Sequence, residues 1–355
     1  MASSNRSTKR ILIVGDGLAG TLVAWELNER GVDFEVWSDG SPAASDVAAG
    51  MFNPVSFRRL LPVWDAEEHM KSAHSRYRSC ELALGVSLWH DVPLLRIFPD
   101  ATYAALWDQR IEEGHPVAGF IEHCAEGDWH ASVAAPHGAG RIRQAGWVDV
   151  QLLVSKSREF WRDRTLWKMQ RWSLEVGCPD GFDAVIDCRG VGAESDLSEF
   201  GLQVKPNQGE VLTVRIEDAM GDETVNNVTW AMPVDSNLFR IGSTYRWDMM
   251  EAQVLEATQK ELLDKANGAR HGTPFSSNQV VDHRAGVRPA SPDRRPIIGR
   301  VSDQRPWYIA CNGWGTRGVL IGPRTAGWTV KACLDENWEV PKEVRPERFR
   351  TFTKN

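Results

Sequence analysis

Three glycines near the start of the chain have the spacing of a turn that binds a dinucleotide. Gly15, Gly17 and Gly20 fit the pattern G-x-G-x-x-G, after an apolar run and before a helical stretch. The first glycine allows a tight turn, the second lets the backbone approach a pyrophosphate, and the third lets the helix pack closely on the strand. We therefore expect a pyrophosphate at the helix N-terminus, where free N–H groups and the helix dipole favour anionic oxygens.

The same unit predicts where a ribose would bind, but it leaves two candidates. A second strand from Phe34 to Trp37 should be followed by an acid that binds the ribose hydroxyls. By spacing this position falls on Ser38, and Asp39 comes one residue later. Either the strand end is shifted by one residue or a hydroxyl makes the ribose contact.

Composition argues against several other classes of protein. With 355 residues, 42% of them hydrophobic, the chain is large enough for two domains. Its net charge of −7 counts against a nucleic-acid partner, because such affinity rests largely on neutralising phosphates. No run approaches the roughly 18 to 20 apolar residues of a membrane span. Residues 1–10 contain no apolar signal core, so we expect a cytoplasmic protein.

The spacing of cysteines and histidines supports neither a metal site nor a redox-active cysteine pair. The six cysteines form no C-x-x-C pair, and the nine histidines show no H-E-x-x-H pattern. We expect reduced, mostly structural cysteines and no metal site.

Alternating helical and extended stretches predict how the chain is organised. Helices are expected from Asp65 to Leu84, from an opening at Gly146–Asp149 to about Arg162, and from Gly313–Val319 through Cys333. Extended stretches are expected at Leu94–Phe98, Phe182–Cys188, Val211–Ile216, Asn237–Ser243 and Trp307–Ala310. The alternation of strands and helices predicts a parallel sheet, and the stretches joined by turns predict a separate domain on a mixed, mostly antiparallel sheet. Residues 41–51 are rich in small side chains, so we expect them to line a ligand, with a surface linker as the alternative.

The order and spacing of six motifs resemble the flavin-dependent D-amino-acid oxidase family, glycine oxidase in particular. The motifs are Gly15-x-Gly17-x-x-Gly20, Ser45-x-x-Ala48-Ala49-Gly50-Met51, Gly190, Ile241-Gly242-Ser243-Thr244, Gly286-Val287-Arg288-Pro289 and Gly315 to Gly318. The resemblance covers nearly the whole chain. It implies an α/β fold in which a Rossmann-like FAD-binding domain of the glutathione-reductase type carries an inserted α+β substrate domain.

The resemblance also implies how the chain is divided and which residues hold the cofactor. The FAD-binding domain would comprise residues 8–75, 146–205 and 283–340, the substrate domain residues 76–145 and 206–282, and a C-terminal tail residues 341–355. The implied FAD-binding residues are Gly15, Gly17, Leu18, Ala19, Gly20, Ser38, Asp39, Ser45, Ala48, Ala49, Gly50, Met51, Gly190, Gly315, Thr316, Arg317, Gly318 and Val319. Some relatives attach flavin through a cysteine near G-x-R-P. Here only Cys188 lies between Cys178 and Cys311, so we expect non-covalent FAD.

Three residues take catalytic roles by the same resemblance. Arg288 of the G-x-R-P motif would bind the substrate carboxylate, and a guanidinium fork matches a carboxylate in two hydrogen bonds. The alternative is an internal salt bridge. Tyr245 would hydrogen-bond the same carboxylate, or only pack. Arg317 would stabilise negative charge on the reduced flavin, or lie exposed at the surface.

These residues favour oxidation of the C–N bond of an amino acid or small amine that bears a carboxylate, with oxygen or another acceptor taking the electrons. The alternatives are oxidation of a 2-hydroxy acid with His283 as base, demodification of an aminomethyl-uridine in tRNA, and a flavin-binding protein without turnover. The basic pair Arg58 and Arg59 would bind an acidic substrate group or cap the domain. The oligomeric state is left open.

Overall fold

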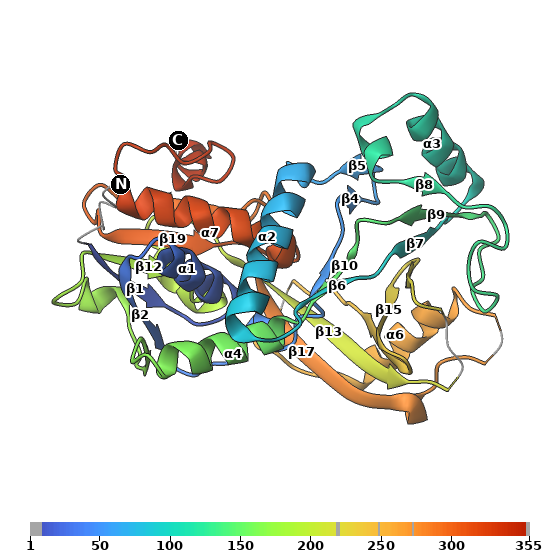
Figure 1. Cartoon of the computed structure of the whole chain (residues 1–355), viewed down its shortest axis with the longest axis horizontal. Coiled ribbons are helices and arrows are strands. Elements are labelled where there is room, and N and C mark those ends of the chain that lie inside the picture. The colour runs from blue at the N-terminus through green and yellow to red at the C-terminus, as the bar shows by residue number, and fades with distance from the viewer. Residues whose placement is uncertain (1–8, 218–220, 248, 272, 353–355) are drawn as a thin grey trace.

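Two large sheets dominate the molecule. The computed structural model describes residues 9–217, 221–247, 249–271 and 273–352. A six-stranded sheet and an eight-stranded sheet stand side by side, with helix α2 (Ala66–Leu84) near the middle of the view (Figure 1). Residue 8 and residues 353–355, which belong to the first and last expected segments, lie outside the described residues.

The six-stranded sheet is parallel except at one edge. Its strands, in spatial order, are β11 (Trp167–Met169), β2 (Asp33–Ser38), β1 (Arg10–Val14), β12 (Ala184–Asp187), β19 (Tyr308–Asn312) and the antiparallel β18 (Ile297–Arg300). In β1, Ile11 and Ile13 join one core, whereas Leu12 and Val14 join a second. Successive side chains of a strand point to opposite faces, so the continuous apolar run suits a strand covered on both sides.

Helices cover the six-stranded sheet and bring the glycine turn to its edge. Helix α1 (Leu18–Glu29) packs against α4 (Val150–Arg162) and α7 (Gly318–Leu334), and α2 packs against α4 and α7. The short helix α5 (Glu194–Ser198) contributes Leu197 to the second core. Helices α1 and α7 both begin just after a strand of this sheet, so their N-termini lie at its carboxyl edge.

The eight-stranded sheet is mixed and mostly antiparallel. Its strands, in spatial order, are β17 (Val280–Ala290), β13 (Lys205–Arg215), β16 (Leu238–Gly242), β15 (Trp230–Asp235), β14 (Thr224–Asn226), β7 (Leu94–Ile97), β9 (Ala139–Ile142) and β8 (Glu122–His123). Among the described strands of this sheet, only β14 and β7 pair in parallel. Helix α6 (Glu256–Asn267) packs Leu262 and Leu263 on this sheet.

Smaller elements connect the two sheets. Helix α3 (Ala101–Glu112) lies beside the far end of the eight-stranded sheet (Figure 1). The remaining strands are β3 (Met51–Phe52), β6 (Trp89–Asp91) and β10 (Gly146–Val148), which form one sheet, and the pair β4 (Val55–Ser56) and β5 (Leu61–Pro62). Short 3-10 turns occur at Ala44–Asp46, Pro116–Gly119, Leu174–Val176, Gly190–Ala193, Ser277–Gln279 and Pro346–Phe352.

The structure confirms the expected fold class and corrects the start of one expected helix. Residues 146–148, expected to open a helix, form strand β10, and the helix begins at Val150. Strand β10 forms because it pairs with β6 and β3, which are distant in sequence. No helix of the described residues is long and apolar enough to cross a membrane. The domain boundaries proposed from the resemblance are not tested by this architecture.

Candidate active site

A cavity of about 690 Å³ runs between the two large sheets. One end is lined by residues at the carboxyl edge of the six-stranded sheet, including Gly15, Ser38 and Cys188. The other end is lined by residues of the eight-stranded sheet, including Gly209, Trp230 and Arg288. A site of this size at the carboxyl ends of parallel strands is typical of dinucleotide binding.

The glycine turn leaves no room for side chains at the start of α1. Gly15 has φ +92°, and a Cβ there would stand 2.8 Å from the carbonyl oxygen of Cys188. A Cβ at Gly20 would collide with the carbonyl of Gly15. The N-cap of α1 is Gly17, with no side-chain cap and no acidic residue in the first turn. The turn therefore presents bare backbone N–H groups to the cavity, as a pyrophosphate requires.

An orphaned hydroxyl faces the same turn. The Oγ of Ser45 is buried and makes no hydrogen bond with any described residue. A Cβ placed on Gly17 would come within 3.1 Å of this oxygen. A buried hydroxyl without a partner costs stability unless something binds to it. The residues present thus fit the diphosphate of FAD.

The carboxylate of Asp16, a residue that no motif singled out for a role, joins side chains from two other elements beside the glycine turn. Asp16 Oδ1 accepts from Ser38 Oγ at 2.7 Å, and Oδ2 accepts from Arg158 Nε at 2.6 Å. Ser38 and Asp39 both line the cavity. The pKa of Asp39 is lowered, chiefly because its carboxylate accepts a hydrogen bond from the Ser41 backbone. Which of the two binds ribose stays a prediction.

The small-residue segment lies in the cavity wall, so the alternative of a surface linker is wrong. Ser45 and residues 47–51 all line the cavity. Gly50 has φ +77°, and a Cβ there would collide with the carbonyl of Val148. The Ala49 carbonyl accepts a hydrogen bond of 3.1 Å from Arg240 Nη1, on β16. The eight-stranded sheet therefore holds the segment in place.

Most residues expected to hold the cofactor from the later segments also reach the cavity. Gly190, Gly315, Thr316, Gly318 and Val319 line it, as do Leu18 and Ala19 of the glycine turn. Arg317 does not line the cavity, although its neighbours on both sides do. Burial lowers the pKa of Arg317, and no ion pair joins it to another described residue. Its role toward flavin stays a prediction.

Arg288 lies at the end of the cavity lined by the eight-stranded sheet, and it has no acidic partner among the described residues. Its Nη1 donates to Asn207 Oδ1 at 3.0 Å and to the Thr244 carbonyl at 3.3 Å. Its Nε and Nη2 make no hydrogen bond with the described residues, and no carboxylate among them pairs with Arg288. The expected alternative of an internal salt bridge is therefore wrong for the described part of the chain. Burial lowers the pKa of Arg288.

Tyr245 stands beside Arg288 at the mouth of the cavity. The Arg288 Cζ lies 5.1 Å from the centroid of the Tyr245 ring, and the tyrosine is 58% exposed. Such a ring stabilises the neighbouring cation and leaves its hydroxyl accessible. Tyr245 lines the cavity, as expected for a residue that contacts substrate.

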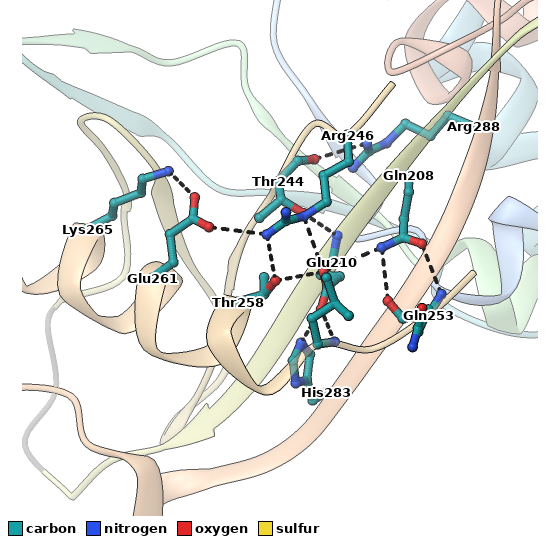
Figure 2. A network of polar contacts seen from close by, with 11 residues as sticks. Gln208, Glu210, Thr244, Arg246, Gln253, Thr258, Glu261, Lys265, His283 and Arg288 are labelled. Carbon is teal, nitrogen blue, oxygen red and sulfur yellow. Dashed lines mark hydrogen bonds and ion pairs between the residues drawn. The ribbon is translucent and has the colours of Figure 1, made fainter. Parts of the chain in front are cut away.

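His283 and the pair Arg58 and Arg59 lie away from the cavity. The Nε2 of His283 contacts Glu210 Oε2 at 2.9 Å, inside a polar network that also holds Thr258 (Figure 2). His283 is not among the residues that line the cavity, so its suggested role as the base for a hydroxy acid is not supported. Arg58 and Arg59 are exposed and do not line the cavity either.

The described cysteines are free, and two of them are close to the cavity. Cys188 and Cys311 line the cavity, and burial raises the pKa of the Cys188 thiol well above its usual range. Six free cysteines lie among the described residues. That part of the chain contains no cluster of His, Cys, Asp and Glu suited to a metal ion. Non-covalent attachment of FAD stays a prediction.

Fold and site together define a flavin-dependent oxidoreductase. Residues 10–332 match the family of FAD dependent oxidoreductases typified by D-amino-acid oxidase, and the chain belongs to that family. It is an enzyme that uses FAD, as the fit of the glycine turn and Ser45 also indicates.

Similar proteins extend over nearly the whole chain. The putative thiamine biosynthesis oxidoreductase ThiO of Rhizobium etli is 26% identical, covering 96% of this chain and 99% of that protein. The bifunctional protein MnmC of Thiobacillus denitrificans, named for tRNA 5-methylaminomethyl-2-thiouridine biosynthesis, is 26% identical, and the match covers 98% of this chain but 61% of MnmC.

Solved structures show the same fold at lower identity. Iminodiacetate oxidase from Chelativorans sp. BNC1 superposes with a TM-score of 0.77 at 21% identity, covering 95% of this chain and 100% of the other. Glycine oxidase from Bacillus cereus gives a TM-score of 0.77 at 17% identity, covering 94% and 96%. The expected likeness to glycine oxidase is confirmed at the level of the fold.

Proposed function

We propose that this protein oxidises the carbon–nitrogen bond of an amino acid or small amine that carries a carboxylate. The proposal depends mainly on Arg288, a cation in the cavity wall. Its Nε and Nη2 atoms donate no hydrogen bond to any described residue, so they are free to bind a ligand. A planar guanidinium binds a carboxylate through two parallel hydrogen bonds. The names of the two similar oxidases, which act on iminodiacetate and glycine, support an amine bearing a carboxylate.

The side chains at the substrate end suit a reaction that needs orientation more than a strong base. FAD held at the glycine turn and Ser45 would supply the acceptor for a hydride from the α-carbon, and the imine product would be hydrolysed by water. Arg288 fixes the carboxylate, and Tyr245 adds a hydroxyl beside it. No acid or imidazole lies among the described residues of the eight-stranded sheet that line the cavity. Holding the α-carbon in one place supplies much of the rate by itself.

The N-terminus of α7 would favour negative charge at the cavity wall. Gly318 and Val319, in its first turn, line the cavity, and its N-cap residue Arg317 makes no side-chain cap. Free N–H groups and a nearby cation favour negative charge at this place. These two features would stabilise negative charge on a reduced cofactor, whose electrons oxygen or another acceptor would take.

One alternative has a specific observation in its favour. The similarity to MnmC supports an aminomethyl-uridine in tRNA as substrate, although the match covers 61% of that bifunctional protein. Binding to tRNA should then weaken steeply as salt rises, because phosphate contacts release counterions. The net charge of −7 favours the small amine.

Anaerobic bleaching of the flavin tests the proposal. The holoenzyme is mixed with amino acids, N-methyl amino acids, 2-hydroxy acids and methylaminomethyl-uridine, and the loss of flavin absorbance is followed. We expect bleaching by at least one carboxylate-bearing amine, and a loss of apparent substrate affinity of about tenfold or more in Arg288→Met. The matched control is Arg284→Met, an exposed arginine on the same strand that does not line the cavity. Bleaching by hydroxy acids alone would contradict the proposal.

A further inference from the structure

Apolar side chains line the cavity on the same sheet as Arg288. Trp230, on β15, lines the cavity and packs in a cluster with Met232 and Trp147. Val211 and Met51 pack against this cluster and also line the cavity. Three apolar side chains, Trp230, Val211 and Met51, therefore face the cavity, more than a substrate without a side chain would contact.

Two glycines allow Arg288 and Trp230 to approach each other over the sheet. Arg288 on β17 lies over Gly209 on β13, where a Cβ would collide with the guanidinium. Trp230 on β15 lies over Gly242 on β16, where a Cβ would stand 3.0 Å from the indole Cζ2. Strands β13 and β16 are neighbours between β17 and β15, so both side chains extend toward the middle of the same sheet face.

The strand register sets the distance between the two groups. Gly242 pairs with Val211, two residues beyond Gly209 on the same face of β13. With standard spacings between strands and along a strand, Gly209 and Gly242 are about 8 Å apart, and the guanidinium and the indole lie over these two positions. An amino acid with a side chain of several carbons spans this gap, and glycine does not.

The charges along the cavity restrict the side chain further. The acidic residues that line it are Asp16, Asp39 and Asp196, all beside the strands of the nucleotide end. Among the described lining residues of the eight-stranded sheet, Arg288 is the one charged group. On this sheet a second carboxylate would find no further lining cation, and an ammonium would find no lining acid.

We infer that the site selects an amine with one carboxylate and an apolar, preferably aromatic, substituent that packs on Trp230. The inference rests on the proposed function and specifies its substrate class. Trp230 is the specificity-determining residue. Glycine and iminodiacetate, which the two similar oxidases are named for, would be poor substrates by this account.

Three carboxylates that share a –CH2CH2COO⁻ unit test the inference by binding alone. The holoenzyme is titrated with propionate, 3-phenylpropionate and succinate, and the shift of the flavin absorption bands reports each Kd. We expect 3-phenylpropionate to bind at least about tenfold more tightly than propionate, since burying a phenyl ring is worth that much or more. Succinate should bind no more tightly than propionate.

A pair of tryptophan variants assigns the preference to one side chain. Trp230→Ala should reduce the ratio of the two dissociation constants to about threefold or less, with propionate binding little changed. The control is Trp147→Ala, from the same cluster but not lining the cavity, which should keep the ratio. Flavin content per chain shows whether each variant is folded. If Trp230→Ala does not hold flavin, Trp230→Leu is measured in its place. The wild-type titration still tests whether the site prefers 3-phenylpropionate to propionate.

The outcomes separate this inference from the proposed function. Equal binding of propionate and 3-phenylpropionate by the wild type would overturn the inference, even if amines bleach the flavin. An unchanged preference in Trp230→Ala would overturn the role of Trp230. Preferential binding of 3-phenylpropionate without bleaching by any amine would support the pocket and contradict the proposed reaction.

Discussion

The guanidinium of Arg288 lies directly against the backbone of Gly209 on the neighbouring strand. A Cβ at position 209 would collide with both terminal nitrogens of the arginine. The Asn207 side chain and the Thr244 carbonyl hold the same guanidinium from one side, at 3.0 and 3.3 Å. The position of the Arg288 guanidinium therefore depends on the absence of a side chain at Gly209.

Gly209→Ala should weaken carboxylate binding without loss of FAD. The added methyl group would displace the guanidinium from its seat, and the two charge-assisted hydrogen bonds to a carboxylate would lose their geometry. These bonds are worth about 1.5–3 kcal/mol each, so a loss of tenfold or more in propionate affinity is expected. Flavin absorbance measures both binding and cofactor content. Gly119→Ala, which has open space around it, is the control, and equal affinity in the two variants would contradict the assignment.

Ser45→Ala should affect the apoprotein and the holoenzyme in opposite ways. The Ser45 hydroxyl is buried without a partner among the described residues, so its removal should leave the apoprotein equally or slightly more stable. If the hydroxyl binds the diphosphate, FAD affinity should fall by about tenfold, the value of one hydrogen bond to a charged group. Thermal unfolding of the apoprotein and quenching of FAD fluorescence measure the two effects. Unchanged FAD affinity would place Ser45 outside the diphosphate site.

His69 should make the protein less stable in acid. Its side chain is fully buried beside Trp64 and Trp328, and neither ring nitrogen has a hydrogen-bond partner among the described residues. Burial, helped by the charge of Arg324 and opposed by Asp65, lowers the pKa of His69 from 6.5 to about 4. The unfolded chain therefore takes up a proton below about pH 6.5 that the folded protein does not bind until about pH 4.

The sign of this effect gives a direct test with His69→Leu. The histidine lowers the free energy of unfolding progressively between pH 6.5 and pH 4, by about 3 kcal/mol at the lower end. Leucine has a similar volume and does not titrate, so the variant should gain stability relative to wild type as the pH falls. Urea unfolding at pH 7, 5.5 and 4 measures the difference. A constant difference across this range would show that His69 titrates normally.

The glycine turn at the carboxyl edge of the six-stranded sheet could be predicted from a local pattern. The spacing of Gly15, Gly17 and Gly20 depends on one turn and the elements beside it, and every residue needed to recognise it is adjacent in sequence. Asp16 is part of that turn but was missed. Its partners Ser38 and Arg158 come from other elements, and only the fold brings them to its carboxylate.

The residues around Arg288 are brought together by strand register, which the sequence does not reveal. Asn207 and Arg288 are 81 residues apart in sequence, and only the pairing of β13 with β17 brings them together. His283 shows the same limit. It lies five residues before Arg288 on β17, and an odd separation along a strand places two side chains on opposite faces. Trp230 gave no local signal at all among 16 tryptophans.

The most direct test of the account compares an amino acid with the same amine lacking its carboxylate. Anaerobic reduction of the flavin is followed with phenylalanine and with phenethylamine, in the wild type and in Arg288→Met. We predict that the wild type is reduced at least about a hundredfold more efficiently by the amino acid, in one of its enantiomers, and that Arg288→Met loses most of this preference. Equal reduction by both compounds in the wild type, or an unchanged preference in the variant, would contradict the claim that Arg288 holds the substrate by its carboxylate.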